Sequence, residues 1–334
     1  MFSNDPNNGP ARSKCKFFSH LVLGIAALST AVVAGAQAYP SKPIRVIMSV
    51  QGGAEVTVRI MSNKVSEALG QPMVIEMMPA AGGSLAAETV KNAAPDGYTI
   101  MYTGASALII RKFVAKNTRY DALKDFSPII RLNETVLHMM VNPAVGINNV
   151  QDLVDYAKKY PGKLSYGTSG IGTSHHLSAE LIRLVAGIDW VHVPYKGAPP
   201  VVTDLIAGRI QVGFGTISTI APILSSGKIR MIAINNGQRY PRYPDVPTIT
   251  EQLPGYIPPP VWTGYYGPAG LPRPIVQRLY DEYLKAATSA EARSKADELG
   301  YFQGTGTPEE LMESVRTGLA IVEKIAKGAG IQPE

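Results

Sequence analysis

Two hydrophobic patterns alternate along most of the chain. Residues 44–50 form a short apolar run rich in β-branched side chains, which predicts a buried strand. Residues 55–69 place apolar side chains every three to four positions, which predicts a helix with one buried face. The apolar residues of that face are Val58, Met61, Val65 and Leu69. A strand therefore leads directly into an amphipathic helix.

The same alternation continues through the middle of the chain. Further strands are expected at residues 73–77, 98–103, 163–167, 190–193, 210–214 and 230–234. Further helices are expected at 84–93, from the N-cap Asn149 to Lys159, and at 173–186. The last of these carries a core stripe of Leu177, Leu181, Leu184 and Val185. Strands that alternate with helices predict parallel sheets with helices on both faces.

The pattern changes after residue 254. Residues 254–260 contain four prolines and a glycine, which predicts a crossing strand or linker. Helices are then expected at 274–287 and 290–299, followed by a last helix. That helix has Thr307 as N-cap, Pro308 at its first position and Glu310 placed to close a capping box.

The first residues have the pattern of a secretory signal peptide. Three cations, Arg12, Lys14 and Lys16, precede an apolar run at 17–34, and a small-residue cleavage site follows at 36–38. The alternative is a membrane anchor, but the run is barely long enough and contains Ser, Thr and Gly. Cleavage after residue 38 would leave a mature protein in the periplasm of a Gram-negative bacterium.

Composition and charge narrow the class of protein. A chain of 334 residues, 45% hydrophobic and 17% charged, is long enough for about two domains with a sizeable core. The net charge of +6 falls to +4 without residues 1–38, and the basic residues are scattered, so nucleic acid is not an expected partner. The only cysteine, Cys15, precedes the cleavage site, which excludes a disulfide framework in the mature chain.

A search for catalytic motifs finds little. The chain has no Gly-x-Ser-x-Gly elbow, no Walker A loop and no Gly-x-Gly-x-x-Gly after a strand. His175 and His176 are adjacent, so on a helix they point about 100° apart and cannot both face one metal ion. We therefore expect no metal and no cofactor. An exported hydrolase that pairs Ser169 or Ser174 with one of these histidines remains an alternative.

Three glycine- and hydroxyl-rich segments each follow a strand and precede a helix. They lie at residues 51–54, 79–84 and 168–174. Ligands of open α/β sheets bind beyond the carboxyl ends of strands, where free backbone N–H groups at helix N-termini attract anions. The three segments together predict a cleft lined by backbone donors, and the implied ligand is a small carboxylate.

From residue 39 onward the chain resembles the extracytoplasmic solute-binding receptors of tripartite tricarboxylate transporters, the Bug family. The resemblance rests on motifs that are weak singly and specific in their order and spacing. They are EALGQP (67–72), AGG (81–83), APDGYT (94–99), PGKLSY (161–166), GTSHHL (172–177), VPYKG (193–197), PDVPT (244–248) and GPAG (267–270).

The resemblance implies an α/β protein with a type II periplasmic binding protein fold, in which two α/β domains close around a ligand cleft. Domain 1 is expected at residues 39–140 plus 258–334, and domain 2 at 141–257. The chain would be a monomer that binds a small organic acid without catalysis and delivers it to the membrane subunits of the transporter. A receptor that feeds a sensor kinase is an alternative.

The resemblance also implies which residues hold the ligand. Two loops would grip one carboxylate, and further residues would border the cleft. The expected binding residues are Gly52, Gly53 and Ala54 on one side, Ser169, Gly170, Thr173 and His176 on the other, and Gly215, Thr216 and Tyr102 at the border.

The chain departs from the family pattern at two places. Its first loop, SVQGGAE at 49–55, lacks the usual Pro-Phe and Thr-Asp pairs, and the segment after Phe214 lacks the frequent Asp or Asn. A basic ligand is therefore not expected. Four aromatic side chains are candidates to flank an aromatic or apolar ligand body: Tyr102, Trp262, Tyr265 and Tyr266.

Overall fold

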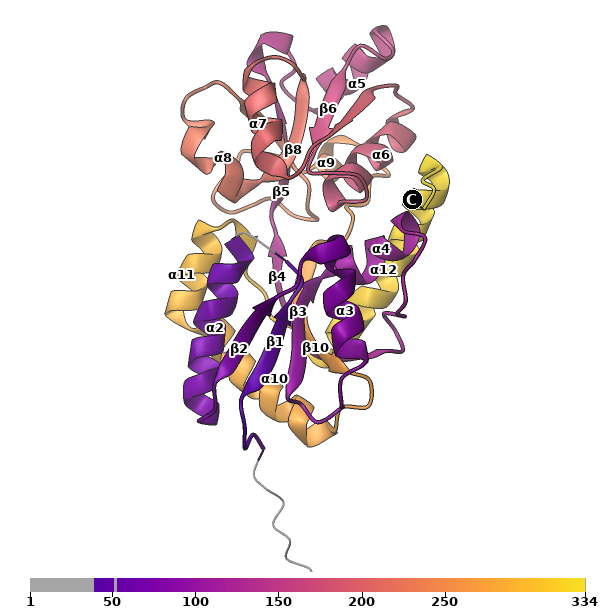
Figure 1. The fold of residues 1–334 in the computed structure, drawn as a ribbon. Coiled ribbons are helices and arrows are strands. Elements are labelled where there is room, and N and C mark those ends of the chain that lie inside the picture. The colour runs from indigo at the N-terminus through magenta and orange to yellow at the C-terminus, as the bar shows by residue number, and fades with distance from the viewer. Residues whose placement is uncertain (1–38, 51–52, 334) are drawn as a thin grey trace, which may run out of the picture. The chain divides into compact units, whose positions relative to one another are not determined.

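The computed structural model describes residues 39–50 and 53–333, and residues 42–334 form one unit (Figure 1). The expected signal peptide at 1–38 lies outside the described residues, so it stays a prediction. None of the helices that the structure describes combines the length and the apolar character needed to span a bilayer.

A six-stranded sheet carries the strands from both ends of the unit. Its order is β11-β4-β10-β3-β1-β2. Its strands are β1 (Ile44–Met48), β2 (Met73–Met77), β3 (Thr99–Gly104), β4 (Phe126–Thr135), β10 (Trp262–Pro268) and β11 (Tyr301–Phe302). β1 pairs in parallel with β2 and β3, whereas β10 runs antiparallel to β3 and β4. The strand from the C-terminal part of the chain therefore sits in the middle of the sheet.

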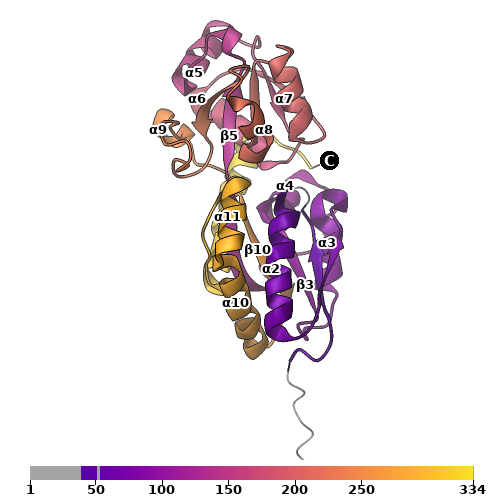
Figure 2. The ribbon, with the colours of Figure 1, turned by 90° about the vertical axis from the view of Figure 1, so that its left-hand side faces the viewer.

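Helices pack on this sheet from both sides. They are α2 (Gly53–Leu69), α3 (Ser84–Lys91), α4 (Arg111–Val114), α10 (Arg273–Thr288), α11 (Ala290–Glu298) and α12 (Pro308–Ala329). Figure 2 shows α10 and α11 beside α2, with which both are in contact. The predicted face of α2 is confirmed, because Val58, Met61, Val65 and Leu69 are all buried. Two short turns complete this half, a 3-10 turn at Ala80–Gly83 and a π turn at Ser106–Ile110.

A five-stranded sheet holds the middle of the chain, in the order β7-β6-β8-β5-β9. Its strands are β5 (Leu137–Val141), β6 (Ser165–Thr168), β7 (Val191–Pro194), β8 (Val212–Thr216) and β9 (Arg230–Ile234). In Figure 1, α5 and α6 lie on one side of it and α7 and α8 on the other. The helices are α5 (Val150–Lys159), α6 (Ser174–Ala186), α7 (Ala198–Ile206), α8 (Ile217–Leu224) and α9 (Ile249–Gln252).

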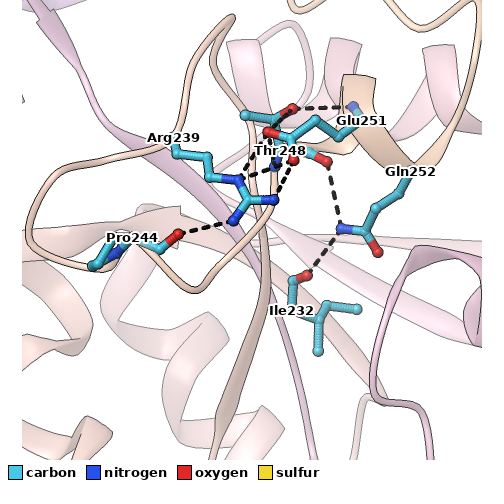
Figure 3. A network of polar contacts seen from close by, with 6 residues as sticks. All are labelled: Ile232, Arg239, Pro244, Thr248, Glu251 and Gln252. Atoms are coloured by element: carbon cyan, nitrogen blue, oxygen red, sulfur yellow. Dashed lines mark hydrogen bonds and ion pairs between the residues drawn. The ribbon is translucent and has the colours of Figure 1, made fainter.

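The chain passes from the first sheet to the second at Val136, the residue between β4 and β5, and returns between β9 and β10. The return segment is anchored by the polar network in Figure 3. There the Arg239 guanidinium donates to the Glu251 carboxylate at 2.9 Å, and Thr248 and Glu251 form a capping box at α9. The division into two domains and their boundaries stay a prediction.

The expected elements are confirmed for most of the chain, and the expected parallel pairing is confirmed for β1–β2, β1–β3, β6–β7 and β6–β8, but both sheets are mixed. β10 in the first sheet and β5 in the second run antiparallel to their neighbours. The reason is the crossing itself, because β5 and β10 each begin at the edge of the sheet where β8 and β3 end, as the pairs Leu137–Thr216 and Thr263–Gly104 show. The sequence patterns also missed β4 and β5, which join the two sheets.

Helix α12 ties the two halves together by apolar packing. Its residues Leu311, Val315 and Ile325 belong to the same buried cluster as Leu177 and Leu181 of α6. Helix α12 is in contact with β4 and with α6. One continuous core therefore runs from the first sheet into the second along this side.

Candidate functional site

The structure contains a cavity of about 670 Å³ where strands of both sheets end. Residues that follow the carboxyl ends of β1, β3, β6 and β8 line it, and the chain order changes direction in each sheet at those strands. Ligands of open α/β sheets bind at such points. The lining from the first half comprises Ser49, Val50, Gly53, Ala54, Gly82, Gly104, Ala105, Ser106, Ala107, Thr135, Val261, Trp262, Thr263, Leu299 and Tyr301. The lining from the second half comprises Leu137, Ser169, Thr173, Ser174, His175, Gly197, Ala198, Pro199, Thr216, Ser218 and Thr219.

The first wall is held by a buried hydrogen bond beneath its loops. Ser49 follows β1, and its hydroxyl donates to Thr103 Oγ1 of β3 at 2.7 Å. Gly83 packs so closely here that a Cβ would lie 2.8 Å from the Ala107 Cβ, and its φ of +90° suits glycine. The loops after β1, β2 and β3 are thereby fixed against one another at the cavity.

The second wall is built on the N-terminus of α6. Thr173 caps this helix: its side chain accepts from the His176 N–H at 3.3 Å and donates to the Gly170 carbonyl at 2.7 Å. Thr216 precedes α8, where its hydroxyl is hydrogen-bonded to those of Ser218 at 3.1 Å and Thr219 at 2.9 Å. Short hydroxyl side chains thus lie at the N-termini of both α6 and α8.

Ser169 and His175 meet in this wall. Ser169 Oγ lies 2.7 Å from His175 Nδ1, and His175 is 7% exposed. Burial lowers the pKa of His175 to about 4, with a smaller opposing effect of the Gly215 backbone. The imidazole is therefore neutral at pH 7.

The electrostatic character of the cavity comes from its backbone. None of the described lining residues is Asp, Glu, Lys or Arg. Residues at the N-terminal ends of α2, α6, α7 and α8 all line it. The first backbone N–H groups of a helix have no partner within the helix and carry partial positive charge. Four such ends, together with the hydroxyl groups, form a site suited to a small anion.

Five of the sequence-predicted binding residues line the cavity. They are Gly53, Ala54, Ser169, Thr173 and Thr216. Gly52 lies outside the described residues. As ligand contacts, all of them stay predictions.

The other four predicted residues lie elsewhere. Tyr102 is 2% exposed and packs edge-to-face on Tyr265 at 5.3 Å between ring centroids. Gly215 is within β8 opposite His138, and the Gly170 carbonyl accepts from Thr173. His176 stacks on His192 at 4.4 Å. None of the four is among the described residues that line the cavity.

The structure brings one of the predicted aromatic side chains to the cavity and adds residues that the sequence did not suggest. Trp262 is the one predicted aromatic that lines the cavity, since Tyr265 and Tyr266 are fully buried in the sheet. Leu299 joins it from the short loop between α11 and β11, and Tyr301 joins it from the start of β11. No motif marks that loop, and only the packing of the C-terminal segment on the first sheet brings it to the site. Ser106, two residues after the end of β3, could have been found from the sequence by its position just after a predicted strand.

The arrangement argues against the hydrolase alternative. Ser169 and His175 are hydrogen-bonded, as a nucleophile and a base would be. However, the described lining residues include no carboxylate to orient the imidazole, and a pKa of about 4 makes His175 a weak base. The described residues also contain no group of three or more His, Cys, Asp or Glu side chains placed to hold a metal ion.

Together the fold and the cavity define an α/β binding protein of the periplasmic class. The family model described as tripartite tricarboxylate transporter family receptor matches residues 57–312. The chain belongs to this family, whose members are periplasmic solute-binding receptors. The resemblance seen in the sequence motifs is therefore confirmed.

Known relatives agree with this assignment. A UPF0065 protein of Bordetella bronchiseptica is 32% identical over 302 residues, which cover 90% of this chain and 89% of the relative. Among solved structures, an R. palustris protein with adipate has a TM-score of 0.77 at 30% identity, covering 89% of this chain and 100% of the other. MatC from Rhodopseudomonas palustris with bound malate has a TM-score of 0.71 at 27% identity, covering 86% and 100%. The periplasmic binding protein BugD has a TM-score of 0.74 at 25% identity, covering 89% and 100%.

Proposed function

We propose that this chain captures a small organic carboxylate, such as a dicarboxylate or an aromatic carboxylate, and delivers it to the membrane subunits of a tripartite tricarboxylate transporter. The observation that carries the proposal is the cavity with four helix N-termini, eleven hydroxyl side chains and no ionised side chain among its described lining residues. Backbone N–H groups and hydroxyls bind a carboxylate, whereas a cationic ligand would find no counter-charge.

The similar structures support the ligand class. One carries adipate and another malate, and both are small dicarboxylates. The volume of about 670 Å³ also lies within the range of small-molecule sites. An aromatic carboxylate could use Trp262 and Tyr301 as apolar contacts. The cavity lining therefore favours neither a dicarboxylate nor an aromatic carboxylate over the other.

Capture would proceed by domain closure. The cavity lining comes from both sheets, so a ligand gains its full set of contacts only when both walls are engaged. Such a ligand shifts the population toward the closed state, and no bond is broken. We infer that the protein has no catalytic role and acts in the periplasm after cleavage near residue 38. The same capture could instead feed a sensor kinase.

The test is calorimetric titration with a panel of mono-, di- and aromatic carboxylates, including malate, adipate and benzoate. Variants Thr173→Asp and Thr173→Asn differ in charge alone, and both residues cap helices well. Because Thr173 lines the cavity, Thr173→Asp should weaken carboxylate binding at least about tenfold relative to Thr173→Asn.

Equal affinities of the two variants would place the anion elsewhere. The absence of any binding heat across the panel would refute the function itself, provided that native mass spectrometry shows no ligand retained from purification. Pull-down against the membrane subunits and against sensor kinases of the host then separates transport from signalling.

A further inference from the structure

One arginine lies beside the cavity, at its rim. Arg111 begins α4 and directly follows the π turn Ser106–Ile110, whose first two residues line the cavity. Its guanidinium lies against Gly82, another lining residue: a Cβ built on Gly82 would lie 3.3 Å from Arg111 Nη1. Gly82 is exposed, which places this contact at the rim. Because position 82 has no side chain, it does not shield the guanidinium from the cavity.

The guanidinium of Arg111 has no acidic partner within residues 39–50 and 53–333. The residue is half-buried, and its Nε is buried without a hydrogen-bond partner. Burial raises the pKa of Tyr120, on which Arg111 and Glu88 act in opposite directions, but Glu88 forms no ion pair with Arg111. A partly buried charge without a partner has a free-energy cost, which a bound anion would remove.

Helix α4 also reaches the opposite wall of the cavity. Val114, three residues after Arg111, packs on Gly172, where a Cβ would lie 2.7 Å from Val114 Cγ2. Gly172 directly precedes Thr173, the N-cap of α6. Arg111 therefore lies at the end of the cavity where the two walls touch. A ligand that extends from the helix N-termini toward this end brings its far group to the guanidinium.

We propose that Arg111 forms a second anion subsite at the rim of the cavity and selects ligands that carry two carboxylates. A guanidinium presents N–H donors in a fixed fork that matches both oxygens of a carboxylate. Since none of the described lining residues is ionised, this cation is what distinguishes a diacid from a monoacid. The inference rests on the proposed function and narrows its ligand class to diacids, aliphatic or aromatic.

The test compares acids that differ in the second carboxylate. Adipate is paired with hexanoate, succinate with butyrate and phthalate with benzoate, in calorimetric titrations of the whole chain. The protein should bind the diacid of at least one pair about tenfold or more tightly than the monoacid. Arg111→Gln should bring the two acids of that pair to similar affinities. Arg111→Lys should keep part of the preference, because the charge remains and the fork is lost.

Lys112→Gln is the matched control. It removes the same charge from the next, exposed position of α4, which is not among the described lining residues, and it should retain the preference for the diacid. A merely structural role of Arg111 predicts instead that Arg111→Gln weakens both acids equally. That result, or equal affinities of the two acids in every pair, would overturn the inference while leaving carboxylate capture intact. Failure of all acids to bind would refute both proposals.

A second measurement uses the unchanged protein. Phenylglyoxal modifies accessible arginines, and peptide mass spectrometry measures the extent at each one. The diacid of the preferred pair should protect Arg111, whereas the same concentration of the monoacid should not. Arg119, which is exposed and outside the described cavity lining, should react equally with either acid present. Equal modification of Arg111 with both acids would overturn the inference even if every variant failed to fold.

Discussion

Three histidines of the second half, His138, His175 and the half-buried His192, lie where the charged form is disfavoured. Burial lowers the pKa of His138 to about 3 and those of His175 and His192 to about 4. An unfolded histidine titrates near 6.5. The unfolded chain therefore binds protons that the folded chain does not, and stability falls as the pH drops below about 6.5.

His138 is suited to isolating this effect, because it is fully buried on β5 and burial is the main cause of its lowered pKa. His175 is the titratable group that also acts on it, and its effect is smaller. As the pH falls from about 5.5 to about 4.5, each such histidine lowers the free energy of unfolding by about 1.4 kcal/mol. His138→Leu should reduce that slope by this amount in urea titrations at several pH values. Met139→Ala, at the next buried position of β5, should lower stability at every pH without changing the slope.

The adjacent residues His175 and His176 show what the sequence could not predict about single residues, namely which of the two side chains lines the cavity. The family resemblance implied His176 as a ligand contact, whereas in the structure His175 lines the cavity and His176 stacks on His192. Adjacent residues of a helix point about 100° apart. The rotation of α6 about its axis decides between them, and burial of Leu177 and Ile182 against the sheet sets that rotation.

At the scale of elements, the sequence was sufficient to predict where helices begin, because capping side chains accept hydrogen bonds from the free backbone N–H groups there. The predicted N-cap Asn149 accepts from the Asp152 N–H at 2.8 Å. The predicted capping box of α12 is present, with Thr307 N–H donating to Glu310 at 2.8 Å and Glu310 N–H to Thr307 Oγ1 at 3.2 Å. Strands β4 and β10 escaped prediction, because their residues become strands only by pairing with each other and with β3.

The capping box of α12 gives an element-level prediction. Thr307→Ala removes the acceptor for the Glu310 N–H and should lower the free energy of unfolding by about 1 kcal/mol. Thr317→Ala makes the same change at an exposed site inside the helix and should be neutral or slightly stabilising. Denaturation in guanidinium chloride measures both. A similar loss in the two variants would show that the cap does not stabilise α12.

At the scale of the whole molecule, the two walls of the cavity belong to different sheets, while α12 and α6 share one core. Closure would therefore bring the walls together without breaking that packed side. The net charge of +4 expected for the mature chain is consistent with an anionic ligand but identifies none.

Ligand-induced closure has a direct signature in solution. Small-angle X-ray scattering should show a smaller radius of gyration when a bound carboxylate is saturating, with a midpoint that matches calorimetry. The Thr173→Asp variant should keep the larger radius of gyration at the same ligand concentration, because its carboxylate repels the anionic ligand. An unchanged radius in a protein that calorimetry shows to be saturated would contradict closure.

The sequence by itself determined what depends on neighbours along the chain: the strand and helix alternation, the caps and the loops at strand ends. Family motifs extended this to the fold. The tertiary structure decided what depends on distant segments, namely the antiparallel β5 and β10, the side of α6 that faces the cavity, and the contributions of Leu299 and Tyr301. Such features follow from packing free energy summed over the whole core, which no local pattern contains.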